Sequence, residues 1–418
     1  MNIKKDRLYV IGRLIGIYRE QRRGKSQNSF TQKSFAKDIC SVNTLKRIES
    51  GETARDEYVY QSLLAKFNLK LGYYEDVDNF IESLMDSLYD AIEYYRLEDI
   101  LTICGKALRV LNEVKEYIYY NELYVLFKST YQYYKEDIEV DDDTMEHFYK
   151  IYSFMNKVYN SLYKRMIFTR AQIYAINNIK FYYNIMEKLD FFNSIRISEK
   201  IPAIHFYYIS KQYLKMKELI EELELLLISA NNYIRLIDIY IFSLLLHSIV
   251  EKEKIENYIL KANAIIIEND IPNIKEREFY SNVAIVYYRI KEHEKALEYF
   301  EIVINEESKQ DDIYLPFLIY MANCQKVLGK EIELPKMNDK NLKKYSKDLQ
   351  LMYNYFNYDE IPLFAKQNMI LKEIAPYLID KEFIKIFRNE MKYLVEVTSN
   401  YKNLLLYDKI VEQNIIKS

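Results

Sequence analysis

The chain has 418 residues, with 59 Lys and Arg, 62 Asp and Glu, and a formal net charge of −3. It holds only 7 glycines and 6 prolines but 43 tyrosines, and half of its residues are hydrophobic. Because proteins built of strands and turns need many more glycines and prolines, the composition excludes a β-rich fold and predicts an all-α protein of more than one domain.

Residues 1–66 differ in charge from the rest of the chain. They contain 14 Lys and Arg against 7 Asp and Glu, whereas residues 67–418 contain 45 against 55. Such a division is expected when only the first segment meets a polyanion. The cationic residues near the end of the first predicted helix are Arg19, Arg22, Arg23 and Lys25. We expect this cluster to contact phosphate, although a basic helix end also complements the helix dipole.

One segment, which ends at Gly51, has the pattern of a DNA-binding helix-turn-helix. A first helix is predicted over 32–39 with Thr31 as its cap, and a second helix is predicted over 42–49 after a break at 40–41. The residues expected to be buried between these helices are Phe35, Ala36, Ile39, Leu45 and Ile48. An ordinary helical hairpin is the alternative, and the basic charge of the segment favours the DNA-binding interpretation.

The second of these helices is predicted to present short polar and basic side chains to DNA. Asn43 and Lys46 are expected to read base edges, because asparagine suits adenine and lysine suits guanine. Gln32 is expected to bind a phosphate. The other candidate DNA contacts are Ser41, Val42, Thr44, Arg47, Arg22 and Arg23.

The body is predicted to be a right-handed α-solenoid of degenerate tetratricopeptide-like helix hairpins. The clearest unit, at 277–310, has these residues at the tetratricopeptide intervals: Val283, Ala284, Tyr287, Ala296, Phe300 and Val303. Looser helix pairs are predicted at 86–111, 204–229 and 238–267, and another first helix at 313–330. The C-terminal helices over 341–415 are interrupted at Pro362 and Pro376. The acidic run 141–143 is interpreted as a helix N-cap in a solvated turn.

A stack of such hairpins has a concave surface lined by the first helix of each pair, and such surfaces usually hold peptides. The candidate peptide-binding residues are Asn282, Asn323, Tyr288, Arg289, Glu278, Ser281 and Ile285. An asparagine side chain can both donate to and accept from one peptide unit, and so hold an extended backbone. For each residue the alternative is a polar group on an exposed helix face that binds no ligand.

The sequence offers no support for catalysis, so we expect neither an enzyme nor a cofactor or metal. The four histidines are more than forty residues apart, and no Gly-rich phosphate loop or Cys-x-x-Cys pair occurs. The first residues are charged and do not resemble a secretory signal, and the most apolar stretch, 239–250, is too short to span a bilayer. Three widely spaced cysteines suit a reducing compartment. We therefore expect a cytoplasmic protein that has no membrane partner.

The helix-turn-helix motif closely resembles that of PlcR-type regulators. Gln32 and Glu49 are seventeen positions apart, one fewer than in the more usual Cro/C1-type domain. The matching runs are Thr31-Gln32-Lys33, Ile39-Cys40 and Arg47-Ile48-Glu49-Ser50-Gly51. Joined to tetratricopeptide-like repeats, the motif makes the chain similar to the RRNPP family of Gram-positive bacteria, with members such as PlcR, PrgX and NprR. These are cytoplasmic receptors for short imported signalling peptides.

The expected organisation is a five-helix Cro/C1-type domain at 1–70, a linker or first solenoid helix at 71–95, repeats at 96–335 and C-terminal helical repeats or a cap at 336–418. The resemblance implies a quorum-sensing transcription regulator. A homodimer would bind double-stranded operator DNA and be switched by a signalling peptide in the concave groove, with Asn282 in the position of a peptide-clamping asparagine. The alternatives are a protein-interaction scaffold and a ligand-independent repressor of a mobile element.

Overall fold

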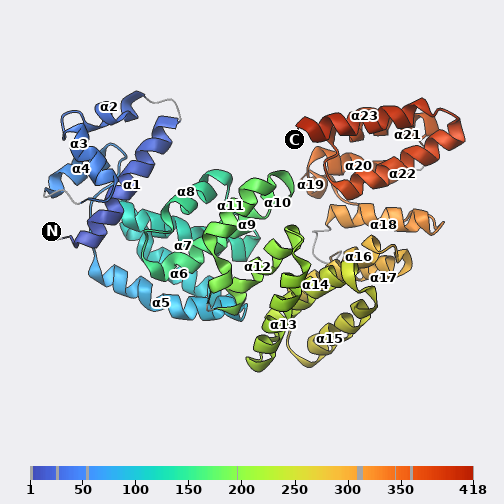
Figure 1. Ribbon diagram of the computed structural model, residues 1–418, viewed down its shortest axis with the longest axis horizontal. Helices are drawn as coiled ribbons and strands as arrows, with labels where there is room; N and C mark the ends of the chain where they lie inside the picture. The colour runs from blue at the N-terminus through green and yellow to red at the C-terminus, as the bar shows by residue number, and fades with distance from the viewer. Residues whose placement is uncertain are drawn as a thin grey trace. The chain divides into compact units, whose positions relative to one another are not determined.

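The computed structural model describes residues 3–24, 28–52, 56–194, 196–307, 314–343, 345–357 and 361–417 (Figure 1). In these residues the chain is helical, and its one extended pairing is an isolated parallel bridge between Lys70 and Tyr117. The all-α prediction is confirmed. The chain folds as two compact units, Met1–Gln212 with Leu225–Arg235 and Tyr213–Glu224 with Leu236–Ser418. The range 96–335, treated above as one array, spans both units.

The first unit begins with a group of short helices packed on α1 and continues as longer helices. Its helices are α1 Lys5–Gly24, η1 Asn28–Phe30, α2 Gln32–Ala36, α3 Val42–Glu49, α4 Glu57–Ala65, α5 Glu75–Glu93, α6 Leu97–Val114, α7 Ile118–Glu136, α8 Asp142–Ile151, η2 Lys157–Tyr159, α9 Asn160–Ala171, α10 Tyr174–Asn177, α11 Ile179–Leu189, η3 Phe191–Asn193 and α12 Ile197–Ile209. Asp141 caps α8 by accepting the Thr144 amide at 2.7 Å, which confirms the N-cap prediction for the acidic run.

Two helices, α13 Tyr213–Ser229 and α14 Tyr233–Val250, contribute residues to both units. The remaining helices of the second unit are η4 Lys252–Lys254, α15 Ile255–Glu268, α16 Asn273–Arg289, α17 His293–Glu307, α18 Leu315–Val327, α19 Asp339–Leu342, α20 Lys347–Asn357, α21 Leu363–Met369, η5 Ile370–Ile374, η6 Ala375–Tyr377, α22 Lys381–Thr398 and α23 Lys402–Lys417. Pro362 caps α21 and Pro376 lies in η6, so both prolines interrupt the helices as predicted.

The helix pair α16–α17 is the one predicted most clearly from the sequence. Ala284 and Ala296 are fully buried, which allows the two helices to approach closely. Tyr287 and Phe300 are also buried beside them. The turn between the helices contains Lys291 in a left-handed conformation, and the predicted turn position is confirmed.

One type of turn recurs at helix ends in both units. The second residue after the helix adopts a left-handed conformation at Tyr95 (φ 50°), Lys211 (φ 58°), Asn231 (φ 51°), Lys291 (φ 69°) and Gly329 (φ 68°). In each case the next amide donates to the carbonyl five residues earlier, over 2.8 to 3.0 Å. This is the Schellman arrangement, in which glycine is the usual left-handed residue. Because most of these positions are not glycine, the turns leave little trace in the composition.

The helix pair predicted at 32–49 is present, with one error of length. Helix α3 spans Val42–Glu49 as predicted, and Gly51 follows it with a φ of 95°. Helix α2 ends at Ala36, so the prediction that it extends to Ile39 was wrong. Asp38 adopts a φ of 66°, and a left-handed residue cannot continue an α-helix.

Helix α14 is long and apolar enough to cross a membrane, with a mean hydropathy of 1.6. The full helix has 18 residues and is longer than the apolar stretch 239–250, which was predicted to be too short to span a bilayer. However, 61% of the helix is buried within the protein, as in the core helix of a soluble protein. It also contains Asp238, which is buried and accepts a hydrogen bond from Lys275 at 2.8 Å.

Glycines determine how closely α1 crosses α3. A Cβ atom at Gly12 would lie 2.3 Å from the carbonyl oxygen of Ile48, and one at Gly16 would lie 3.1 Å from the Cβ atom of Glu49. The first distance is far below van der Waals contact and involves backbone, which cannot move without shifting α3. The orientation of α3 therefore depends on the absence of a side chain at Gly12.

We predict that Gly12→Ala destabilises the protein by about 1–3 kcal/mol, the usual effect of overpacking a close contact. Gly105→Ala is the matched control, because Gly105 lies within α6 with no atom near its Cβ position. This control should stabilise the chain by about 0.5–1 kcal/mol through helix propensity. Urea unfolding followed by circular dichroism measures both, and equal stability of the two variants would contradict the proposed α1–α3 contact.

Candidate functional site

Helix α3 has a buried side and an exposed side. Leu45 and Ile48 are at most 1% exposed, and α3 packs on α1 and α2. Asn43, Lys46 and Arg47 are exposed, as a DNA-reading surface requires. The structure thus brings the predicted base-reading side chains together on one accessible face of a short helix.

The other predicted contacts of α3 lie at its two ends. Ser41 caps the helix by accepting the Thr44 amide at 3.0 Å, and the two hydroxyl groups are 2.9 Å apart. Val42 and Thr44 are half-buried. At the other end, the Arg47 Nε donates to Glu52 at 2.6 Å, with both side chains more than half exposed. A surface pair of this kind contributes at most about 1 kcal/mol and leaves Arg47 available to a phosphate.

Arg19 is not available for phosphate contact, and the prediction that it belongs to the phosphate-binding cluster was wrong. Its side chain is 2% exposed and binds Glu49 through Nε at 2.5 Å and through the second terminal nitrogen at 2.9 Å. A further hydrogen bond of 3.3 Å reaches the Phe30 carbonyl. The Gln32 side chain donates to the same Glu49 carboxylate at 3.3 Å. Glu49 therefore ties together α1, α2 and α3.

Arg22 and Arg23, also predicted to bind phosphate, are exposed near the end of α1. The Arg22 guanidinium lies 5.9 Å from the ring centre of Phe30 and 6.0 Å from that of Phe67, within the range of a cation–π contact. Lys25, the remaining member of the cluster, lies outside the described residues. Arg22 and Arg23 thus remain candidates for phosphate contact.

The opposite side of α1 packs against the longer helices of the first unit. Arg7 forms an ion pair with Asp78 of α5, and its guanidinium lies 3.4 Å from the ring centre of Tyr119 in α7. Farther along α1, the Tyr18 hydroxyl accepts a hydrogen bond of 3.0 Å from Asn121. The helix that supports α3 is therefore itself held by charged and polar contacts.

A histidine of α8 belongs to the same contact. His147 lies 2.7 Å from Glu122 through Nε2 and 2.9 Å from Gln21 of α1 through Nδ1. Burial disfavours the charged imidazole, but the attraction of Glu122 and the hydrogen bond outweigh it, so that the pKa of His147 is raised. A cavity of about 620 Å³ adjoins these side chains. The sequence did not indicate this group, because Glu122 and Gln21 lie 25 and 126 residues from His147.

Most of the candidate peptide-binding residues lie on α16 of the second unit. Ser281 and Asn282 are half-buried, and their side chains donate to carbonyls of their own helix at 2.7 and 2.8 Å. Glu278 is exposed and accepts a hydrogen bond of 2.7 Å from Lys275. Lys275 also binds Asp238 of α14. Ile285 is half-buried on the same helix. These residues occupy one helix, and the polar side chains of Ser281, Asn282 and Glu278 are each hydrogen-bonded within the protein.

Two of the candidates form a buried pair. The Asn323 side chain of α18 donates to the Tyr288 hydroxyl at 2.8 Å, and these residues are 8% and 7% exposed. Their polar groups therefore join α18 to α16. A peptide could reach them only if this hydrogen bond were exchanged for one to the ligand.

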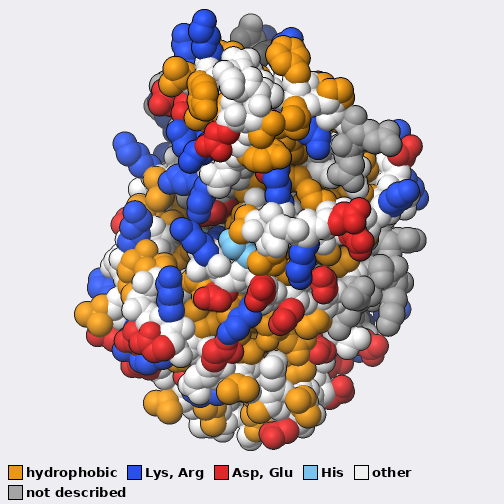
Figure 2. Space-filling view, turned by 90° about the vertical axis from the view of Figure 1, so that its right-hand side faces the viewer, with side chains coloured by type: hydrophobic (Ala, Val, Ile, Leu, Met, Phe, Trp, Pro, Cys, Tyr) orange, Lys and Arg blue, Asp and Glu red, His pale blue; other side chains and the backbone are white. Residues whose placement is uncertain are grey.

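Basic residues also occur in the second unit, at the turn between α16 and α17. Burial lowers the pKa of His293, and the positive charges of Lys385 and Lys291 lower it further. Arg289, a peptide-binding candidate, is exposed. Burial raises the pKa of the neighbouring Tyr320, and the positive charge of Arg289 partly opposes that rise. Figure 2 shows several Lys and Arg side chains on part of one face of the molecule, with Asp and Glu side chains interspersed among them.

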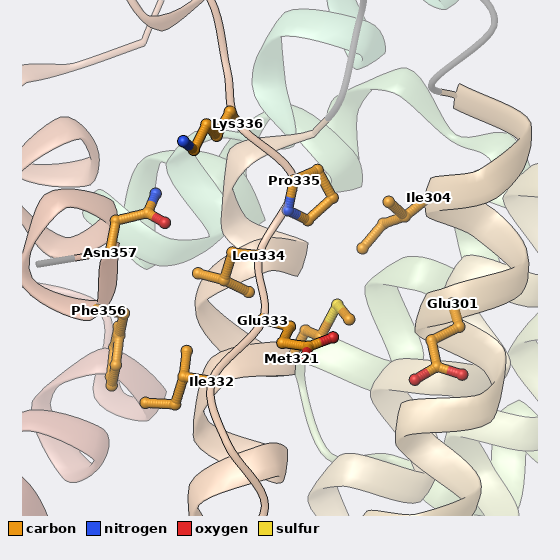
Figure 3. A pocket seen from close by; sticks show the side chains of 10 residues that line it. All are labelled: Glu301, Ile304, Met321, Ile332, Glu333, Leu334, Pro335, Lys336, Phe356 and Asn357. Atoms are coloured by element: carbon orange, nitrogen blue, oxygen red, sulfur yellow. The ribbon is translucent and has the colours of Figure 1, made fainter. Parts of the chain in front are cut away.

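The second unit has a cavity of about 480 Å³ beside α17, α18 and α20 (Figure 3). Its lining residues are Glu301, Ile304, Met321, Ile332, Glu333, Leu334, Pro335, Lys336, Phe356 and Asn357. The sequence did not indicate this cavity, because half of its lining comes from a non-helical segment.

Among the described residues, no group of three His, Cys, Asp or Glu side chains is placed to hold a metal ion. The three cysteines are free thiols, and burial raises the pKa of both Cys104 and Cys324 to about 12. These two thiols therefore stay protonated and are poor nucleophiles at neutral pH.

Comparisons with known proteins give no family assignment. No family model, no curated protein and no solved structure matches the chain.

Two half-buried histidines of the first unit should affect stability with opposite signs. The raised pKa of His147 implies stabilisation that is complete below about pH 6.5 and lost as the pH rises through the pKa of the folded state. Burial lowers the pKa of His205 to about 4, so that its contribution is present above about pH 6.5 and is lost as the pH falls towards 4.

We therefore predict that the free energy of unfolding of the unmodified chain falls as the pH rises above about 6.5. In His147→Gln this fall should be absent. His205→Gln is the matched control and should instead reduce the loss of stability on acidification. Urea unfolding at a series of pH values gives both differences. The same pH profile for His147→Gln and the unmodified chain would refute the charged His147–Glu122 pair.

Proposed function

We propose that the protein is a sequence-specific DNA-binding transcription regulator whose activity is switched by a short signalling peptide. The observation that carries the proposal is the exposed face of α3, where Asn43 and Lys46 project from a helix fixed by the Arg19–Glu49 pair. The basic charge of residues 1–66 supports it, because phosphate attraction supplies much of the affinity for DNA.

In this proposal α2–turn–α3 is a helix-turn-helix, and α3 enters the major groove. Asn43 and Lys46 read bases, and the remaining contacts hold the phosphates and set the register. The residues proposed to contact the DNA backbone are Gln32, Ser41, Val42, Thr44, Arg47, Arg22 and Arg23. A homodimer would place two such helices on the half-sites of an operator.

The contacts of α1 suggest how a change in the body reaches the DNA-binding helices. Arg7 and Tyr18 join α1 to α5 and α7, while Gly12 and Arg19 join it to α3. A shift of α7 or α8 would therefore move α1 and α3 together. In a dimer such a movement changes the spacing of the two recognition helices.

For the sensing part, we propose that the helix pairs form a tetratricopeptide-like array that binds the peptide, as in the RRNPP family. Asn282 is the residue that we expect to bind the peptide backbone, and it lies half-buried on α16. Arg289 at the end of the same helix suits a carboxylate of the ligand. A cytoplasmic location belongs to this proposal, since the peptide and the operator must both be reached.

The DNA-binding part predicts a sequence-dependent effect at Lys46. On an operator selected from a random DNA library, Lys46→Ala should weaken binding by about 1–3 kcal/mol, because a base contact is lost. Binding to random-sequence DNA should weaken much less. Fluorescence anisotropy at a fixed salt concentration measures both affinities.

Lys106→Ala is the matched control, because Lys106 is an exposed lysine on α6, outside the basic segment. It should leave both affinities unchanged. An equal loss on both DNAs for Lys46→Ala, with a salt slope lower by about 1, would assign Lys46 to a phosphate. Absence of any selected operator would reject the DNA-binding function.

The sensing part predicts that one of the peptides encoded by short reading frames beside the gene stabilises the protein against heat at micromolar concentration. Asn282→Ala should raise the dissociation constant of that peptide about tenfold, because backbone hydrogen bonds are lost. Asn273→Ala, an exposed asparagine at the start of the same helix, is the control and should have no effect. Stabilisation by none of these peptides would favour a scaffold or a ligand-independent repressor.

A further inference from the structure

A short extended segment of the second unit, residues 331–337, follows α18 and precedes α19. We name these residues the strap. They form no helix, and their exposure alternates along the chain. The half-buried members are Ile332, Leu334, Pro335 and Met337, and the exposed ones are Glu331, Glu333 and Lys336. This alternation is that of an extended chain with one side against a protein surface.

The strap is held at its backbone by an amide side chain. Gln325 of α18 donates to the Glu333 carbonyl oxygen at 3.2 Å and accepts from the Glu333 amide at 3.2 Å. Gln325 is only 5% exposed. A buried amide that satisfies both backbone groups of one residue binds an extended chain without reading its side chain at that position.

A tyrosine provides a second backbone contact. The hydroxyl group of Tyr353, on α20, donates to the Pro335 carbonyl at 2.8 Å and accepts from the Met337 amide at 3.1 Å. Tyr353 is 4% exposed. Together, Gln325 and Tyr353 satisfy four backbone groups of the strap from two different helices.

Strap residues 332–336 line the cavity of about 480 Å³ described above. Figure 3 shows Ile332 and Leu334 on the side of Phe356, and Pro335 on the side of Ile304. The space between α17 and α20 is thus only partly filled by the strap. Backbone-binding amide and hydroxyl groups beside a partly filled cavity are the features of a site for an extended peptide.

We propose that this groove between α17, α18 and α20 is a peptide-binding site, and that the strap occupies it as an internal ligand. The external ligand is a short extended peptide with apolar residues at alternate positions followed by proline, as in the strap sequence Ile-Glu-Leu-Pro. The inference goes beyond the proposed function, because this groove is a second peptide-binding site, separate from the α16 residues proposed above to bind the signalling peptide.

Because the strap belongs to the same chain and is tethered beside the groove, it competes with an external peptide. It thereby lowers the apparent affinity of the groove for that peptide. A short tether gives an effective concentration in the millimolar range, and tethering changes apparent affinity by roughly a hundredfold or more. Loosening the strap should therefore increase binding of an external peptide by a similar factor. An ordinary structural connection would show no such increase.

The test uses the full chain and a fluorescein-labelled synthetic peptide with the sequence of residues 331–338. In the variant Ile332→Ser/Leu334→Ser, the strap loses its apolar contacts and the groove is freed. We expect this variant to bind the peptide at least tenfold more tightly than the unmodified chain in fluorescence anisotropy. A peptide of the same composition in scrambled order should not bind.

A third substitution distinguishes the groove from exposed apolar surface in general. Gln325→Ala, added to the strap variant, should weaken binding about tenfold because two backbone hydrogen bonds are lost. The matched control is Gln413→Ala, an exposed glutamine on α23, which should leave binding unchanged. Equal binding of the ordered and scrambled peptides, or no binding to a strap variant that keeps its helical circular dichroism, would overturn the proposal.

A second measurement applies if the strap variant does not fold. In the unmodified chain, excess unlabelled peptide should displace the strap and accelerate hydrogen exchange at the Glu333 and Met337 amides. Unchanged exchange at both amides would overturn the proposal. Neither experiment contains DNA, and Asn282→Ala should not affect either result. Failure of this inference is therefore distinguishable from failure of the proposed function.

Discussion

The arrangement of the DNA-binding candidates depends on the ion pair between Arg19 and Glu49. The two charges come from α1 and from the last residue of α3, and Gln32 of α2 binds the same carboxylate. Removing one member of a buried ion pair typically costs about 3–5 kcal/mol, because the other charge is left without a partner. The pair thus specifies one orientation of α3, and the exposed positions of Asn43 and Lys46 follow from that orientation.

The pair acts together with a contact in which backbone approaches backbone. Without a side chain, Gly12 lets α1 lie against the Ile48 carbonyl, at the same end of α3 as Glu49. Helices that cross this closely have little freedom to rotate, since interiors are packed at nearly crystalline density. When α3 changes position, α1 must therefore move with it as one rigid group. This α1–α3 group is held to the rest of the first unit at Arg7, Tyr18 and Gln21.

The sequence predicted elements well wherever local pattern decides the structure, as for the bounds of α3 and the helix pair around Ala284 and Ala296. The sequence did not predict features that depend on one residue's backbone conformation or on a partner residue far away in the chain. The end of α2 depends on the left-handed φ of Asp38, and charge counting assigned Arg19 to DNA because a count does not reveal the distant Glu49. The hydrogen bonds between Gln325 and the strap form only because the extended chain folds back onto α18. Only the alternating apolar residues after Gly329 gave a signal for it.

The contacts that hold α1 to the longer helices include several charged and polar pairs. Arg7–Asp78, Tyr18–Asn121 and the His147 group are ionic or hydrogen-bonded, and water can satisfy all of these groups once the surfaces separate. Burying such groups costs desolvation that the pairing offsets only in part. The net free energy that opposes separation is therefore smaller than for an apolar surface of the same area. An interface balanced in this way can have two arrangements of similar free energy, which is the physical requirement for a switch.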